Sequence, residues 1–236
     1  AVCLFLGCKS SDINKHDKAT EDLLTKIQHQ TFKYFWEGAE PTSGLARERI
    51  HMDGEYPQND KDVITIGGSG FGLMGILVAE QRKFIQPQEA QDRFKKSLTY
   101  LSKLPRFQGA YAHWYEGPSG KVKAFGDKDN GGDIVETAFL AQALICVREY
   151  YKNGTQEQKE IAALADNIWR EINWKHYTNG KDVIYWHWSP EHEFGMNHPI
   201  QGFDECLITY VLAASSPTFP IEKQVYDRGW ARSGQI

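Results

Sequence analysis

The sequence has few cysteines, no excess of positive charge and no long hydrophobic run. Lys and Arg number 27 against 31 Asp and Glu among the 236 residues, a formal net charge of −4, which argues against nucleic-acid binding through an electropositive surface. Of the four cysteines, Cys146 and Cys206 lie in apolar helical runs and are predicted to be small buried hydrophobic residues. Neither a disulfide framework nor a zinc site follows from the cysteine spacing.

The histidines likewise give no metal motif. His187, His192 and His198 share one segment but lack the HExxH spacing of a zinc site, so no metal and no cofactor is predicted. The chain is 41% hydrophobic, 13% aromatic and 25% charged, which is typical of a folded globular protein of one large or two small domains.

Residues 1–19 read as the end of a bacterial signal peptide followed by a polar linker. The apolar run of residues 1–7 is far shorter than the roughly 20 residues of a spanning helix. Its end, Phe5-Leu6-Gly7-Cys8, resembles a lipobox, which would place a lipid on Cys8 after cleavage. A short apolar strand is the alternative. We therefore expect a lipid-anchored or secreted protein of the periplasm or outer membrane, with its folded body at residues 20–236.

Hydrophobic periodicity predicts six helices of two alternating kinds. Those at residues 20–37, 87–104 and 155–173 carry one apolar stripe, whereas those at 70–82, 133–151 and 204–214 are apolar on most sides. A helix with one stripe covers a surface, and one that is apolar all round is buried. The alternation predicts an all-α (α/α)6 barrel of helical hairpins. Because three hairpins do not close such a barrel, the chain is predicted to be its N-terminal half, with an open solenoid as the alternative.

Long loops precede each of the predicted inner helices. They span residues 38–69, 105–132 and 174–203, so all three should lie at one end of the barrel, where long loops commonly carry function. Small β-hairpins are expected at residues 111–125 and 182–188. The glycine run at residues 67–72 lacks the preceding strand and the lysine of a phosphate loop and is predicted to permit close helix packing.

Carboxylates gather at the starts of two inner helices. Asp129, Asp133 and Glu136 surround a Gly-Gly turn, and Glu205 stands at the start of the sixth helix. Glycoside hydrolysis needs one carboxylic acid and one carboxylate on either side of the scissile bond. Asp133 and Glu136 also have the spacing of a capping box, which has no functional implication, and the two interpretations are about equally supported. Glu205 is expected near the buried start of its helix.

Aromatic residues and histidines fill two of the long loops. Aromatic faces stack on sugar rings while nearby polar groups bind hydroxyls, so these segments suit a carbohydrate cleft. Packing against the barrel rim is the alternative for about half of the rings. The predicted sugar-binding residues are Tyr111, His113, Trp114, Trp186, His187, Trp188, Arg47 and Asn197.

Several motifs in order make the sequence similar to a known family. Residues 32–36, 43–46, 66–73, 130–139, 186–190 and 202–205 together resemble the bacterial glycoamylase-like proteins of glycoside hydrolase family 144. The resemblance runs from about residue 22 to 230. It implies an (α/α)6 barrel and an endo-β-1,2-glucanase that releases short sophorooligosaccharides with inversion.

The resemblance also implies a catalytic set, namely Asp129, Asp133, Glu136 and Glu205, with Glu205 or Glu136 as general acid. The chain has Asp204 where the family usually has Asn, and its charge would raise the pKa of Glu205. The expected partner is a β-glucan, bound by a monomer. Two alternatives stay open at this point: a glycan-binding lipoprotein without catalysis, and a glucoamylase-like or β-glucosidase-like hydrolase of another linkage.

Overall fold

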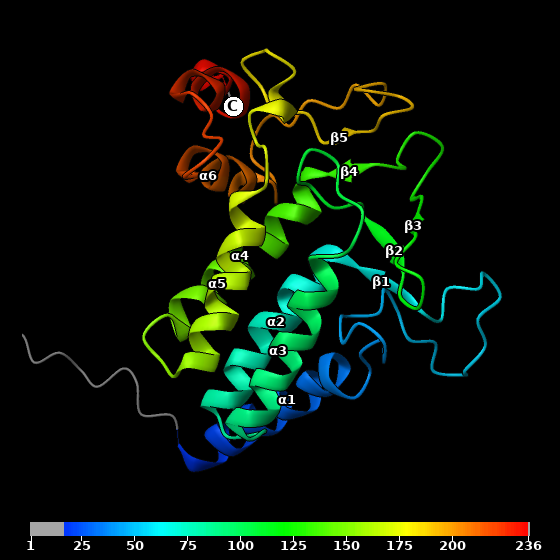
Figure 1. Cartoon of the computed structure of the whole chain (residues 1–236), viewed down its shortest axis with the longest axis vertical. Coiled ribbons are helices and arrows are strands. Elements are labelled where there is room, and N and C mark those ends of the chain that lie inside the picture. Colours follow the sequence, from blue (N-terminus) through cyan, green and yellow to red (C-terminus); the bar gives the residue numbers. More distant parts are fainter. Residues whose placement is uncertain (1–16, 236) are drawn as a thin grey trace, which may run out of the picture.

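The computed structural model describes residues 17–235, so the predicted lipobox at Cys8 lies outside the described residues. In this part of the chain six α-helices carry the fold (Figure 1). Their bounds are α1 (Lys18–Trp36), α2 (Ile66–Gln81), α3 (Pro87–Leu101), α4 (Ile134–Tyr151), α5 (Gln156–Arg170) and α6 (Leu207–Ser215), followed by short helical turns at Val225–Trp230 and Arg232–Gly234.

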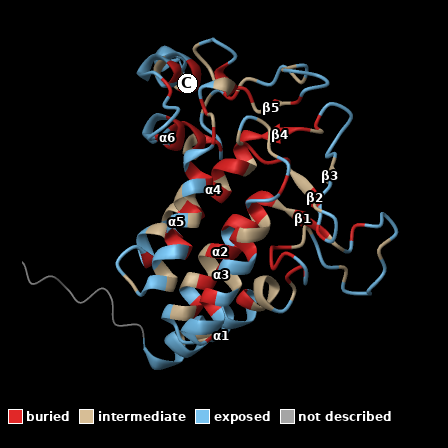
Figure 2. Ribbon diagram, viewed as in Figure 1, coloured by how far each residue is buried: buried red, intermediate tan, exposed pale blue. Residues whose placement is uncertain are grey.

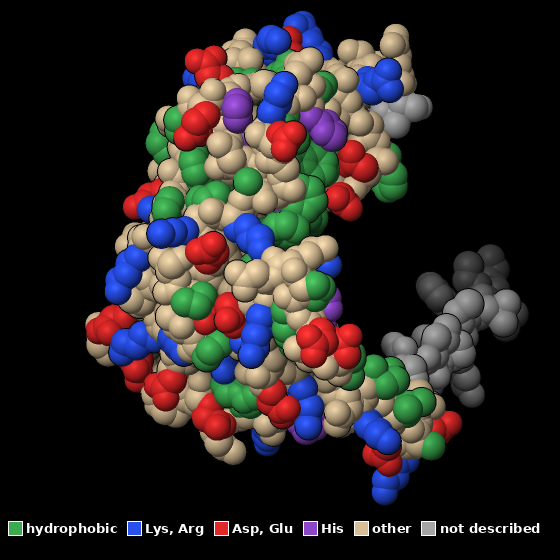
Figure 3. All heavy atoms as spheres, turned by 90° about the vertical axis from the view of Figure 1, so that its right-hand side faces the viewer, with side chains coloured by type: hydrophobic (Ala, Val, Ile, Leu, Met, Phe, Trp, Pro, Cys, Tyr) green, Lys and Arg blue, Asp and Glu red, His purple; other side chains and the backbone are tan. Residues whose placement is uncertain are grey.

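The even-numbered helices form an inner layer and the odd-numbered helices an outer layer. α4 packs between α2 and α6, while α1 lies against α2, α5 against α4, and α3 against both α2 and α5. Most of α4 is buried, but Phe32 is the one buried residue of α1 (Figure 2). The predicted alternation and the mostly helical toroid class are therefore confirmed. Hydrophobic side chains gather beside a hollow along one edge of the molecule (Figure 3).

Two of the inner helices begin away from their predicted starts. α2 begins at Ile66 rather than at residue 70, because glycines that resemble a turn in the sequence are here the first turns of a buried helix. A Cβ on Gly70 would lie 2.3 Å from the carbonyl oxygen of Phe139 in α4, which confirms that the run permits close packing. α6 begins at Leu207 rather than at residue 204, since Asp204 accepts the N–H of Cys206 at 2.8 Å in a preceding turn.

Five short strands bring the loops together. β1 (Val63–Thr65), β2 (Trp114–Glu116) and β3 (Val122–Lys123) form an antiparallel sheet, and β2 and β3 are the hairpin expected at residues 111–125. The prediction of a β-hairpin at residues 182–188 is wrong. That segment instead supplies β5 (His187–Trp188), which pairs with β4 (Gly132–Asp133) from the preceding long loop.

The long loops lie at the end of the helices where the strands are, opposite the short α2–α3 and α4–α5 connections (Figure 1). The pairing of β4 with β5 places Asp133 directly opposite His187, so the strands fix the predicted functional loops against each other. Cys206 is buried as expected, but the prediction for Cys146 is wrong, because this residue is exposed on α4. Within residues 17–235, no helix combines the length and the apolar character needed to cross a membrane.

Candidate active site

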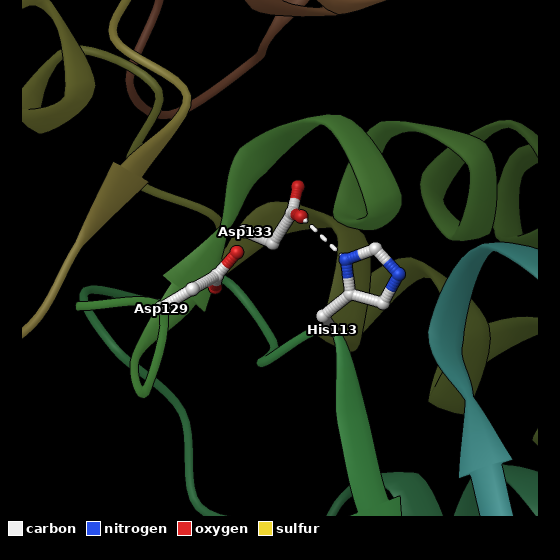
Figure 4. A group of neighbouring side chains, drawn as sticks. All are labelled: His113, Asp129 and Asp133. Carbon is white, nitrogen blue, oxygen red and sulfur yellow. Dashed lines mark hydrogen bonds and ion pairs between the residues drawn. The ribbon is translucent and has the colours of Figure 1, made fainter. Parts of the chain in front are cut away.

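Asp133 lies at the centre of the site, immediately before α4, with no exposed surface. Its Oδ1 accepts the backbone N–H groups of Val135 and Glu136 at 3.0 and 2.9 Å, capping the helix. Its Oδ2 pairs with His113 Nδ1 at 3.0 Å (Figure 4) and also accepts from Trp186 Nε1 at 3.0 Å. A carboxylate offers about four acceptor positions. Asp133 therefore orients the groups around it and has no oxygen left over for a substrate.

Burial raises the pKa of Asp129, helped by the negative charge of Asp133, to about 6. Asp129 lies in a tight turn just before β4 and is 8% exposed, and its buried Oδ1 has no hydrogen-bond partner within the described part of the chain. The nearest basic atom, His187 Nε2 at 3.6 Å, already accepts the N–H of Gly131, and burial lowers the pKa of His187. Asp129 is thus the carboxylate least compensated by donors.

Glu136 lies one turn into α4 and is half-buried. Its carboxylate does not complete the capping box with Asp133. Oε2 instead accepts the N–H of Gly67 in the first turn of α2 at 2.9 Å. Burial and the charge of Asp133 raise the pKa of Glu136, while His113 and the Gly67 N–H oppose the rise. The side chain therefore reaches across to the neighbouring inner helix rather than back along its own.

Glu205 differs from its expected environment. It is exposed in the turn before α6 rather than near a buried helix start, because the helix begins two residues later. Its charge nevertheless raises the pKa of Glu136 slightly, which places it on the same side of the molecule as the cluster. Burial raises the pKa of the Cys206 thiol, and the neighbouring Asp204 raises it further.

A cavity of about 230 Å³ opens beside Asp129 and Asp133, whereas Glu136 and Glu205 are not among its lining residues. It is lined by His113, Phe125, Asp129, Asp133, Trp186, Met196 and His198. The ring of Phe125 stacks on that of His113 at a centroid distance of 4.2 Å, and the Trp186 ring lies 5.1 Å from that of His198. Burial alone would lower the pKa of His113, but its hydrogen bond to Asp133 and the negative charges of Asp133, Glu136 and Asp129 together outweigh burial and raise the pKa. Aromatic walls beside carboxylates suit a bound sugar.

The other predicted sugar-binding residues divide between the surface and the core. Trp114 and Trp188 are half-buried and keep part of their rings exposed. His187 and Tyr111 are buried, and the Tyr111 hydroxyl donates to the carbonyl of Leu101 at 3.1 Å. The packing alternative therefore applies to these two side chains, because the loops fold over the inner helices and pack their own rings.

Arg47 and Asn197 lie outside the cavity. The Arg47 guanidinium donates to the carbonyls of Gly38, Ala39 and Lys61 at 2.7–2.9 Å and pairs with Asp62, so its donors brace the loop between α1 and α2. Asn197 is exposed at a turn with φ of 47°. We therefore exclude Arg47 from the proposed sugar-binding set.

Three lining residues escaped the sequence analysis. Phe125 ends the aromatic segment at residues 111–125, a signal that could have selected it. Met196 and His198 lie in a loop without a distinguishing pattern, which the Trp186 backbone N–H holds at the cavity by donating to the His198 carbonyl at 3.0 Å. His113, Asp129 and Asp133 bring ligand atoms within 4.8 Å of one another, the spacing of a metal site. The oxygens of Asp133 are already saturated, so we interpret the trio as the hydrogen-bonded pair of His113 and Asp133 with the Asp129 carboxylate beside it.

Comparison with known proteins places this site in context. The Glycoamylase family model matches residues 197–236, and a family of unknown function, DUF3131, matches residues 26–169. An exo β-1,2-glucooligosaccharide sophorohydrolase acting at the non-reducing end, from Parabacteroides distasonis, is 43% identical over 214 residues, which cover 89% of this chain and 29% of the relative.

Solved structures give the same result. The endo-β-1,2-glucanase from Chitinophaga pinensis, in complex with sophorotriose and glucose, matches with a TM-score of 0.90 and 52% identity over 91% of this chain and 52% of its own. A β-1,2-glucanase from Parabacteroides distasonis matches with a TM-score of 0.84 and 42% identity, over 89% of this chain and 30% of its own. The chain thus spans about half of the Chitinophaga pinensis enzyme and under a third of each of the two Parabacteroides distasonis proteins. It belongs to the glycoamylase-like family, consistent with glycoside hydrolase family 144.

Proposed function

We propose that the chain contributes part of the active site of a β-glucan hydrolase, an endo-β-1,2-glucanase that works by carboxylate acid/base catalysis with inversion. The observation that carries the proposal is the cavity in which Asp129 and Asp133 stand beside the rings of His113 and Trp186. The endo-acting relative supports the choice of reaction, because it shares more identity and more of its length with this chain than the exo-acting one does.

The geometry supports different roles for Asp133 and for the two glutamates, Glu136 and Glu205. Asp133 holds Trp186 and His113 in place and is a positioning residue. Glu136 and Glu205 are the candidates for general acid, since Glu136 has one oxygen outside its hydrogen bond to Gly67 and Glu205 is exposed. A general acid must be protonated while the partner carboxylate activates water. The raised pKa of Glu136 favours the acid role for this residue.

Substrates with different leaving groups separate acid from base. Glu136→Gln and Glu205→Gln would each be made in the full-length protein and assayed on linear β-1,2-glucan and on an aryl β-sophoroside with an activated phenol. Loss of the general acid should lower kcat on the glucan by about 10²-fold or more and spare the aryl substrate, which needs no protonation to leave. Loss of the base should depress both. Wild-type rates for both variants on both substrates would refute the assignment.

Product analysis tests the linkage and the mode of cleavage. Linear β-1,2-glucan, a β-1,3-glucan and starch serve as separate substrates, and chromatography follows the products with time. Endo action predicts a range of β-1,2-linked oligosaccharides from the first minutes, whereas release of disaccharide alone would indicate exo action. Sugar binding without any product would favour the glycan-binding alternative. Lipid attachment at Cys8, residence in the periplasm or outer membrane and a monomeric state remain predictions.

A further inference from the structure

We infer that Gly67, in the first turn of α2, is a positioning residue for the Glu136 carboxylate, and that this position must be glycine because the carboxylate occupies the space of a side chain. The inference rests on the proposed function only where it concerns catalysis. It adds a second reason for a glycine at residue 67, where a Cβ would also lie 3.2 Å from Cδ2 of Phe139 in α4.

Two contacts fix the Glu136 carboxylate on α2. The Gly67 N–H donates to Oε2 at 2.9 Å, and this N–H belongs to the first turn of a helix, where backbone donors are free and the helix dipole favours negative charge. A Cβ on Gly67 would lie 2.4 Å from the same Oε2 and 3.0 Å from the Glu136 Cδ. The carboxylate therefore sits directly over the bare Cα, and any side chain at residue 67 displaces it.

Other glycines of α2 serve different purposes. A Cβ on Gly70 would meet the backbone of Phe139 at 2.3 Å, so Gly70 sets the distance between α2 and α4. A Cβ on Gly75 would come within 3.8 Å of the Phe35 ring and nothing closer, an ordinary van der Waals contact. Substitution of Gly70 by alanine is therefore a control for helix packing, and substitution of Gly75 by alanine is a control for helix propensity.

The charges around Glu136 come from both helices and from the loops. The charges of Asp133 and Glu205 raise its pKa, whereas His113 and the N–H of Gly67 lower it. Burial raises the pKa most strongly. For a carboxylate that stays buried between α2 and α4, the loss of the Gly67 N–H removes an influence that lowers the pKa. The pKa of Glu136 should then rise further, so the limb of a pH–rate profile that Glu136 governs should move to higher pH, whether Glu136 acts as acid or as base.

A thermal-stability cycle on the full-length protein tests the contact without any assay of activity. Gly67→Ala should lower the Tm in the wild-type background and lower it clearly less in a Glu136→Ala background, where the obstructing carboxylate is gone, alanine favours the helix and only the Phe139 ring, 3.2 Å from the new Cβ, still opposes the substitution. Gly70→Ala should lower the Tm in both backgrounds, and Gly75→Ala should lower it in neither. An equal loss for Gly67→Ala in both backgrounds, or no loss in either, would overturn the inference.

Kinetics then tests the link to catalysis. We expect Gly67→Ala to reduce kcat by roughly 10²-fold, the scale of a displacement of about 1 Å at a reacting group, with KM within about twofold and the pH limb shifted upward. Gly75→Ala should keep wild-type kcat and pH profile. A wild-type enzyme without hydrolytic activity would remove the proposed function but leave the stability cycle standing. Wild-type kcat and pH profile in Gly67→Ala would refute the positioning role itself.

Discussion

Replacing Asp133 by Asn tests whether its Oδ2 holds Trp186 against the cavity. This oxygen accepts from Trp186 Nε1 and pairs with His113 Nδ1, each at 3.0 Å, on a side chain with no exposed surface. The asparagine oxygen can still cap α4, because Asn caps a helix as well as Asp. Its NH2 group then faces the indole N–H, so that a donor meets a donor. His113 can adapt by presenting a bare Nδ1, but Trp186 cannot.

The magnitude follows from the unpaired indole. A buried donor without a partner costs about 1–3 kcal/mol. Because Trp186 is half-buried and lines the cavity, Asp133→Asn should lower the free energy of unfolding of the full-length protein by about 1–2 kcal/mol, the lower part of that range. Trp186→Phe is the matched background, because it keeps a ring and removes the N–H. In that background Asp133→Asn should cost clearly less, with a coupling of about 1–2 kcal/mol measured by chemical denaturation. Additive effects would refute the reasoning that Asp133 acts on Trp186.

Three further predictions concern Asp129 and the aromatic loops. The pKa of Asp129 is raised from 3.8 to about 6, so folding favours its protonated form and stability should fall by about 3 kcal/mol as the pH rises from about 4 to 6 and beyond. Asp129→Asn should lack this loss in a series of Tm values against pH, and parallel curves would contradict it. Trp188→Ala and Trp114→Ala should raise KM by roughly fivefold through about 1 kcal/mol of lost stacking. Tyr111→Phe should cost about 1 kcal/mol of stability at unchanged KM; unchanged KM in all three would make the two tryptophans structural.

The burial of whole helices could be predicted, because it follows from the spacing of apolar residues along the sequence. An inner helix such as α4 is apolar on nearly every side, and α5 shows one stripe, so their layers follow from composition at helical spacing. The clustering of acids at the start of α4 also follows from the sequence alone. The roles of Asp133 and Glu136 do not follow from the sequence. Their spacing is the same whether they form a capping box or contact groups outside their own helix.

Contacts across long sequence separations could not be predicted. β4 and β5 are two residues each, too short to show alternation, and they lie more than fifty residues apart. Their pairing nevertheless creates the cavity wall by bringing Trp186 to Asp133. Similarly, nothing in the sequence around Arg47 shows whether its guanidinium faces a sugar or backbone carbonyls, since only the fold of the loop decides this.

Three neighbouring carboxylates at one mouth would repel one another if none were compensated, and the structure compensates them unequally. Asp133 has four donors around its two oxygens, and Glu136 has the N–H of Gly67. The buried Oδ1 of Asp129 has no partner among residues 17–235. As the pH falls toward 6, Asp129 therefore takes up a proton first, because protonation there removes the least compensated charge. That proton relieves the repulsion between Asp129 and Asp133. The pKa of Glu136 is instead raised by burial and by the charge of Asp133, against the opposing effects of His113 and the Gly67 N–H, so Asp133 is the charge that links the two sites.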